Sequence, residues 1–201
     1  VVAPSGNPTT EQTRTPLPCS RRAQVATQVG GNMVIYGLTV LVYSLTSSSS
    51  AVSVLFLTFL VPGVLFSALA GVYVDRLDRR LILVATNLLR AAMFGLMLLA
   101  RDQLAAIYLL NVAVSVVTTF FAPAEAAMIP MLVPRRQLVA ANGLFTLTLN
   151  GAFAFGFALL GPLVVTVAGP EALIALVALL YLLAAVFCIT LPASPAASGG
   201  I

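Results

Sequence analysis

Histidine and lysine are both missing from this sequence of 201 residues, and all ten of its basic residues are arginines. Without histidine, imidazole proton transfer and histidine ligation of a metal are excluded for this segment. The two cysteines, Cys19 and Cys188, form no closely spaced pair, so the sequence indicates neither a disulfide framework nor a zinc site. We therefore expect no metal and no cofactor.

Charged residues are also scarce, at 8% of the chain against 60% hydrophobic residues. A soluble domain carries roughly a quarter charged residues, so water cannot surround most of this chain. Residues 23–74 contain no charge at all. Because about twenty apolar residues already span the hydrocarbon of a bilayer, this stretch must hold two crossings and a turn. We expect an all-α membrane protein whose main partner is the lipid bilayer.

Apolar segments long enough to cross a membrane recur along the chain, separated by short polar turns. They are residues 24–45, 52–74, 81–100, 104–127, 138–167 and 172–191. We expect a disordered tail over residues 1–22, a bundle of six spans over 23–191, and a flexible linker starting at 192–201.

The arginines gather on one side of these predicted spans. Arg101 stands alone on one side, and the side of the amino terminus carries Arg14, Arg21, Arg22, Arg76, Arg79, Arg80, Arg135 and Arg136. Arginines beside apolar spans set membrane orientation, so this asymmetry predicts that both ends of the segment are cytoplasmic, in the cell (inner) membrane. For the same reason the net positive charge does not indicate nucleic-acid binding.

The turn between the second and third spans carries a recognisable motif. Its key residues are Gly71, Asp75, Arg76, Arg79 and Arg80. This turn resembles the signature cytoplasmic loop of the major facilitator superfamily, although Asp78 stands where many members have glycine. That departure is common in the branch that holds macrolide-efflux and enterobactin-export proteins.

A second block, at the end of the fourth span and the start of the fifth, resembles the same branch. It consists of Phe120, Phe121, Ala122, Pro123, Ala124, Ala127, Pro130, Leu132, Val133, Pro134, Leu138, Ala141, Asn142 and Leu144. The resemblance covers residues 24–191. It implies a six-helix bundle that forms the amino-terminal half of a twelve-helix fold.

The turn motif has two interpretations. The resemblance implies a gating loop that stabilises the outward-facing state, in which Gly71 permits close helix approach and Asp75 bonds with the arginines. Alternatively, the arginines only set the topology. Both roles can coexist.

The fifth span contains Gly156, Gly161 and Pro162. A Gly-Pro pair in this span is similar to the antiporter motif of drug exporters, but Phe157, Val165 and Thr166 stand where that motif has glycine. Close helix packing is therefore the favoured role for these residues, with proton antiport as the alternative.

Uncharged polar residues form stripes at spacings of three and four, which place each set on one helix face. The candidate cavity-lining residues are Gln28, Asn32 and Tyr36 in the first span, Asn111, Ser115 and Thr118 in the fourth, and Asn142, Thr146 and Asn150 in the fifth. A polar face in lipid should turn toward protein or a water-filled cavity. Interhelical hydrogen bonding without a ligand is the alternative for any single residue.

Arg90 is the one charge deep within a predicted span. An unpaired charge there is costly, so Arg90 should find an acid. Glu125, near the cytoplasmic end of the fourth span, is the expected partner, with Asp75 second. We expect a structural charge pair between Arg90 and Glu125 rather than a substrate site.

Together these patterns predict half of a secondary transporter. The resemblance implies an exporter of drug-like or siderophore-like small molecules that works by alternating access, with a second six-helix half as its partner. A scaffold that transports nothing and a half-transporter that homodimerises are the alternatives. An intramembrane enzyme is not expected, because histidine, lysine and a carboxylate pair in mid-span are all missing.

Overall fold

The computed structural model describes residues 17–74, 77–132 and 138–189. In chain order the elements are α1 (Leu17–Thr46), α2 (Ser49–Val74), α3 (Arg79–Leu99), α4 (Leu104–Leu132), α5 (Leu138–Phe153), the π-helical segment η2 (Ala154–Leu160) and α6 (Gly161–Ile189). No strand occurs in these described ranges. The expected all-α membrane class is confirmed.

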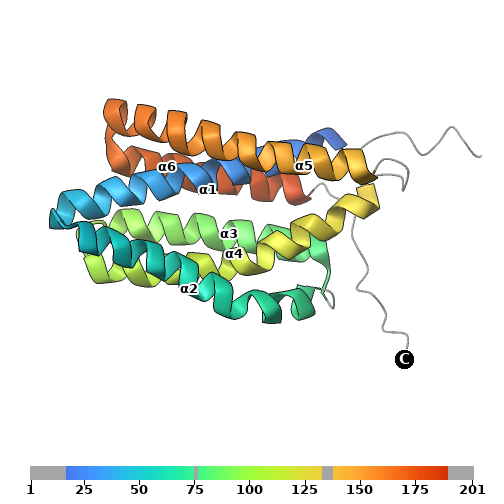
Figure 1. Cartoon of the computed structure of the whole chain (residues 1–201), viewed down its shortest axis with the longest axis horizontal. Coiled ribbons are helices and arrows are strands. Elements are labelled where there is room, and N and C mark those ends of the chain that lie inside the picture. Colours follow the sequence, from blue (N-terminus) through green and yellow to red (C-terminus); the bar gives the residue numbers. More distant parts are fainter. Residues whose placement is uncertain (1–16, 75–76, 133–137, 190–201) are drawn as a thin grey trace, which may run out of the picture.

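The last apolar segment makes two crossings. Five helical segments are long and apolar enough to span a membrane, and the last, Asn142–Ile189, is 48 residues long. At about 1.5 Å per residue, a straight helix of that length would be more than twice as long as the roughly 30 Å of bilayer hydrocarbon. The chain instead folds back at its left-hand end in Figure 1. The turn lies at Gly169, where φ is 89° and ψ is 167°, a backbone conformation open essentially to glycine.

The first helix begins within the expected amino-terminal tail of residues 1–22. Helix α1 starts at Leu17, so residues 17–22 are helical in the structure. Pro18 fits this start, because the first turn of a helix has no intrahelical partner for its N–H groups. Residues 1–16 and 190–201, the rest of the predicted tail and linker, lie outside the described residues.

Short polar turns end and begin the helices. At the end of α1, Ser47 has a φ of 50°, and its N–H donates to the carbonyl of Tyr43 at 2.7 Å. Asp78 is the N-cap of α3, since its Oδ1 accepts the N–H of Arg80 at 2.9 Å. Asp78 therefore has a structural role of its own: it satisfies a backbone donor that the helix leaves free.

The helices form two groups that pack against each other. In Figure 1, α1, α5 and α6 lie on one side and α2, α3 and α4 on the other. Helix α6 packs on α1 and α3, and α4 packs on α2 and α3. The largest fully buried side chains include Met33 of α1, Phe94 and Met97 of α3, Ile107 of α4 and Leu173 of α6. The core thus lies between α1, α3, α4 and α6.

Helix α2 contributes little to this core. Only 11% of the residues in its most apolar stretch are buried inside the bundle, against 39% of those in α3. Its exposed side chains are large and apolar, and they include Leu60, Val64 and Leu65. Lipid or another protein surface must cover them, as expected for a membrane protein.

Candidate functional site

The structure describes part of the predicted gating loop. Arg79 and Arg80 open helix α3, while Asp75 and Arg76 lie outside the described residues. Gly71 lies near the end of α2, where an added Cβ would meet no described atom within 4 Å. The described part of the chain therefore shows no close helix approach at Gly71.

The polar stripe of α4 divides between two environments. The amide of Asn111 donates to the carbonyl of Leu55 at 3.1 Å and to the hydroxyl of Thr58 at 2.9 Å, both on α2. Ser115 donates to the carbonyl of Phe59, also on α2. Asn111 and Ser115 are 4% and 2% exposed. They hold α4 to α2 and do not form an open surface.

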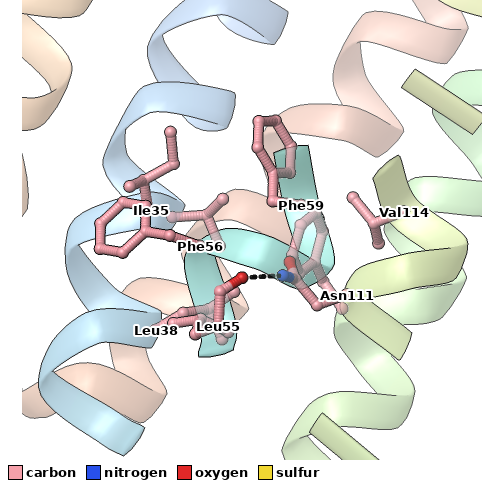
Figure 2. Close-up of a pocket in the computed structure, with 9 residues that line it drawn as sticks. Ile35, Leu38, Leu55, Phe56, Phe59, Asn111 and Val114 are labelled. Atoms are coloured by element: carbon pink, nitrogen blue, oxygen red, sulfur yellow. Dashed lines mark hydrogen bonds between the residues drawn. The ribbon is translucent and has the colours of Figure 1, made fainter. Parts of the chain in front are cut away.

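Figure 2 shows Asn111 pointing at Leu55 beside a small cavity of about 40 Å³. Apolar side chains surround the amide there, and they come from α1, α2, α3 and α4. They are Val34, Ile35, Leu38, Leu55, Phe56, Phe59, Phe94 and Val114. A hydrogen bond in such a dry environment is strong, so this contact fixes the pairing of α2 with α4.

A larger groove of about 570 Å³ opens between the same two helices. Its lining includes Gly63 and Ser67 from α2 and Thr118, Thr119 and Pro123 from α4. Proline has no N–H, so Pro123 cannot bond the carbonyl of Thr119. In a bilayer, a free backbone carbonyl is tolerated where it meets protein or water. The lining of this groove is mainly apolar, and the hydroxyl of Thr118 within it donates to the carbonyl of Val114 in its own helix at 2.7 Å.

The stripe of α5 is exposed along its whole length. Asn142, Thr146 and Asn150 are all exposed, and the amide of Asn150 donates to the carbonyl of Thr146 in its own helix at 2.9 Å. The hydrogen bond of Asn150 thus stays within α5 and joins it to no other helix. They form the most open of the three predicted polar stripes.

The stripe of α1 is partly buried beside an aromatic cluster. The amide of Asn32 donates to the carbonyl of Gln28 at 2.8 Å. The ring of Tyr36 meets Phe157 edge to face, with 5.9 Å between ring centres, and Phe157 stacks on Phe153 at 5.4 Å. Aromatic rings and amides thus share the region where α1 meets α5 and η2.

Glycines bring the fifth crossing close to α1. A Cβ at Gly156 would lie 2.8 Å from the carbonyl oxygen of Val29, and one at Gly161 would lie 3.0 Å from the Cβ of Tyr36. Gly156 belongs to the π-helical segment η2, and Pro162 follows Gly161 at the start of α6. Small residues are what allow membrane helices to approach this closely.

The expected ion pair between Arg90 and Glu125 is not formed. Among the described residues, Arg90 has no carboxylate within 4 Å, whereas Arg101 lies 3.9 Å from both Asp102 and Glu171. The guanidinium carbon of Arg90 instead lies 4.1 Å from the ring centre of Phe121 and 5.1 Å from that of Tyr181. Glu125 accepts a hydrogen bond from the side-chain amide of Gln28 at 3.0 Å. Two aromatic rings, and not a carboxylate, therefore contact the guanidinium of Arg90.

The fold and these contacts agree with one known family. A family model described as Major Facilitator Superfamily matches residues 23–200. The chain belongs to the major facilitator superfamily. No curated protein matched the chain in a sequence search.

Membership gives the chain a general activity. Members of the major facilitator superfamily are membrane transporters and in general not enzymes, so this chain is a membrane transporter of that superfamily, with several helices able to cross the bilayer. Its substrates are small molecules. The family match covers the loop, the stripes and the Arg90 cluster described above.

Several contacts of this superfamily chain were missed by sequence reasoning. Gly37 of α1 faces α6, where an added Cβ would lie 2.6 Å from a methyl carbon of Leu173, and Gly30 faces Leu180. Their spacing of seven residues is the signal that could have revealed this interface. The sequence could not have identified Phe121 and Tyr181 as the partners of Arg90, because aromatic residues are common in apolar spans.

Proposed function

We propose that this superfamily chain is the amino-terminal half of an exporter of drug-like or siderophore-like small molecules. It works by alternating access with a second six-helix half, and the substrate cavity lies between the halves. The resemblance of its loop and of its fourth and fifth spans to macrolide-efflux and enterobactin-export proteins supports this substrate class.

The observation that carries the proposal is the exposed, uncharged polar stripe of α5. Asn142, Thr146 and Asn150 are exposed on a membrane-crossing helix. In hydrocarbon, an amide without a hydrogen-bond partner costs on the order of several kcal/mol. A face that carries amides should therefore not turn toward lipid. Further along the same crossing, Phe157 contacts Tyr36 of α1, and such rings suit an amphipathic solute. Amides with aromatic rings and no charge favour a drug-like substrate over an ion.

In this proposal the turn after α2 is a latch. Gly71, Asp75, Arg76, Arg79 and Arg80 stabilise one conformation of the transporter through charge-assisted bonds at the cytoplasmic ends of helices. The arginine distribution supports a cytoplasmic position for both ends of the segment, in the cell (inner) membrane.

Efflux from proteoliposomes tests the proposal. Asn150→Leu should lower the efflux of a fluorescent dye and of a macrolide by about tenfold, which corresponds to about 1.4 kcal/mol of lost hydrogen bonding to the substrate. Thr166→Val is the matched control. Thr166 is exposed on the same crossing and bonds only its own helix, through the carbonyl of Leu163 at 2.9 Å. Equal efflux by both variants would contradict a substrate role for the α5 stripe.

A half-transporter that homodimerises is the second candidate. The exposed apolar face of α2 must be covered by lipid or by protein, and in this candidate a second copy of the chain covers it. Cross-linking in native membranes separates the two candidates. A cross-linked species of twice the protein's mass that carries the efflux activity would favour the homodimer, and efflux by the monomeric species would favour the exporter with its own second half.

A further inference from the structure

Arg90 is a buried cation with incomplete hydrogen bonding. The residue is 2% exposed, and its Nε and Nη2 atoms have no hydrogen-bond partner. Stacking on Phe121 and Tyr181 stabilises the charge but satisfies no N–H group. Buried donors without a partner are rare and costly, so each calls for a physical explanation.

The carboxylate of Glu125 lies within electrostatic range of Arg90 but bonds elsewhere. Phe121 and Glu125 are four residues apart on α4 and so share one helix face, about 6 Å apart along the axis. The guanidinium already covers the ring of Phe121. Arg90 and Glu125 thus approach the same face of α4, where a charge-assisted bidentate pair can form once the side chains change rotamer.

The partner that Glu125 has in this structure is neutral. Gln28 of α1 donates one hydrogen bond to Oε2 and cannot balance a negative charge. Within a membrane span, an ionised carboxylate needs either a cation or a proton. A carboxyl oxygen accepts the amide N–H of Gln28 in either protonation state, so without a cation in contact a proton must neutralise Glu125. The unpaired N–H groups of Arg90 suit an ionised Glu125.

We propose that Glu125 is a proton-binding site with two alternative partners, Gln28 when it is protonated and Arg90 when it is ionised. One proton from water enters the carboxylate as the bond to Arg90 breaks, and it returns to water when that bond re-forms. In the protonated state Glu125 ties α4 to α1; in the ionised state it ties α4 to α3. Binding or release of the proton thus changes which helix Glu125 contacts.

The surroundings of Glu125 contain few other charges. The described titratable or charged groups that act on it are Arg90 of α3 and Cys188 of α6, and Gln28 faces it from α1. Asn87 of α3 donates to the sulfur of Cys188 at 3.7 Å, and its buried Oδ1 has no partner. This oxygen can accept a hydrogen bond from an N–H group of Arg90 or from a water molecule that accompanies the exchange.

A double-mutant cycle on the purified protein tests the exchange. The thermal midpoint Tm is measured in detergent for the parent protein, Arg90→Gln, Glu125→Gln and the double variant, at acid and at alkaline pH. We expect a coupling between the two positions of several degrees at alkaline pH and none at acid pH, since only the ionised carboxylate pairs with Arg90. In the Glu125→Gln background, Arg90→Gln should change Tm by the same amount at both pH values, because only the contact of Arg90 with the aromatic rings is then lost.

Arg101→Gln and Glu171→Gln provide the matched control cycle, because that pair has the same residue types at 3.9 Å on an exposed surface. Its coupling should be small at both pH values. Arg90→Lys should restore part of the alkaline coupling, because lysine retains the charge without the planar fork. Coupling of Arg90 with Glu125 that is the same at both pH values, or absent at both, would overturn the proposal.

The role of this exchange in energy coupling rests on the proposed function, and a second readout keeps the two apart. In proteoliposomes, Glu125→Gln should abolish the acceleration of efflux by a pH gradient and leave downhill efflux of the dye. If the Tm cycle shows the pH-dependent coupling but no solute moves, the exporter fails and the exchange stands. If solute moves without the coupling, the exchange fails alone.

Discussion

Two arginines of this chain lie in opposite environments and have different partners. Arg101, whose side chain is 53% exposed, lies 3.9 Å from both Asp102 and Glu171 in the turns that join helices. Arg90 is 2% exposed, lies on two aromatic rings and has no carboxylate within 4 Å among the described residues. In water a loose ion pair forms at little cost and contributes little. Inside the bundle, packing decides which groups a cation meets, and there each contact is worth more.

The comparison predicts that the contacts of Arg90 contribute more to the free energy of unfolding than those of Arg101. Phe121→Leu should lower the free energy of unfolding by about 2 kcal/mol or more, because a desolvated cation–π contact is lost together with the ring's packing. Tm of the purified protein measures the change. Phe155→Leu, at a ring that is 50% exposed, is the control and should have a smaller effect. Equal losses would show that Arg90 gains nothing from the ring.

At the turn that holds Glu171, backbone geometry should matter more than charge. Gly169→Ala should destabilise the protein by about 1–3 kcal/mol, since alanine is strained at a φ of 89°. Gly95→Ala lies within α3 with no atom within 4 Å of the added Cβ, and it should stabilise the helix by roughly 0.5–1 kcal/mol. Thermal unfolding of the two variants measures both changes in stability. A neutral Gly169→Ala would mean that the turn between the fifth and sixth crossings adapts freely.

The smallest effect is expected at the exposed ion pair itself. Glu171→Gln should change stability by less than about 0.5 kcal/mol, because Arg101 stays hydrated and keeps Asp102 nearby. Added salt should reduce even this difference by screening. Unfolding measured at low and at high salt checks both points. A loss that is large and independent of salt would remove the contrast between the two arginines.

Sequence patterns predicted the spans well and their contacts less well. Length and hydropathy predicted six spans, because a bilayer fixes both the length and the polarity of a span. The described structure has five apolar helical segments of spanning length, and the last turns at Gly169, between the fifth and sixth predicted spans. The stripe at Asn111 and Ser115 bonds α2 from one face of α4. Its spacing could not tell that this face meets backbone carbonyls of α2, since a cavity and a neighbouring helix both attract polar side chains.

The Arg90 cluster shows where this limit arises. The sequence alone determined that the chain is an all-α membrane protein, that its crossings lie between short turns, and that a charge inside the third span needs a partner, because these follow from transferring residues out of water. Only the tertiary structure decided that the partner is a pair of aromatic rings, that Glu125 bonds Gln28, and that glycines seat α1 between η2 and α6. Those outcomes depend on how helices rotate and cross, which is set by the packing of many side chains at once and by no local pattern.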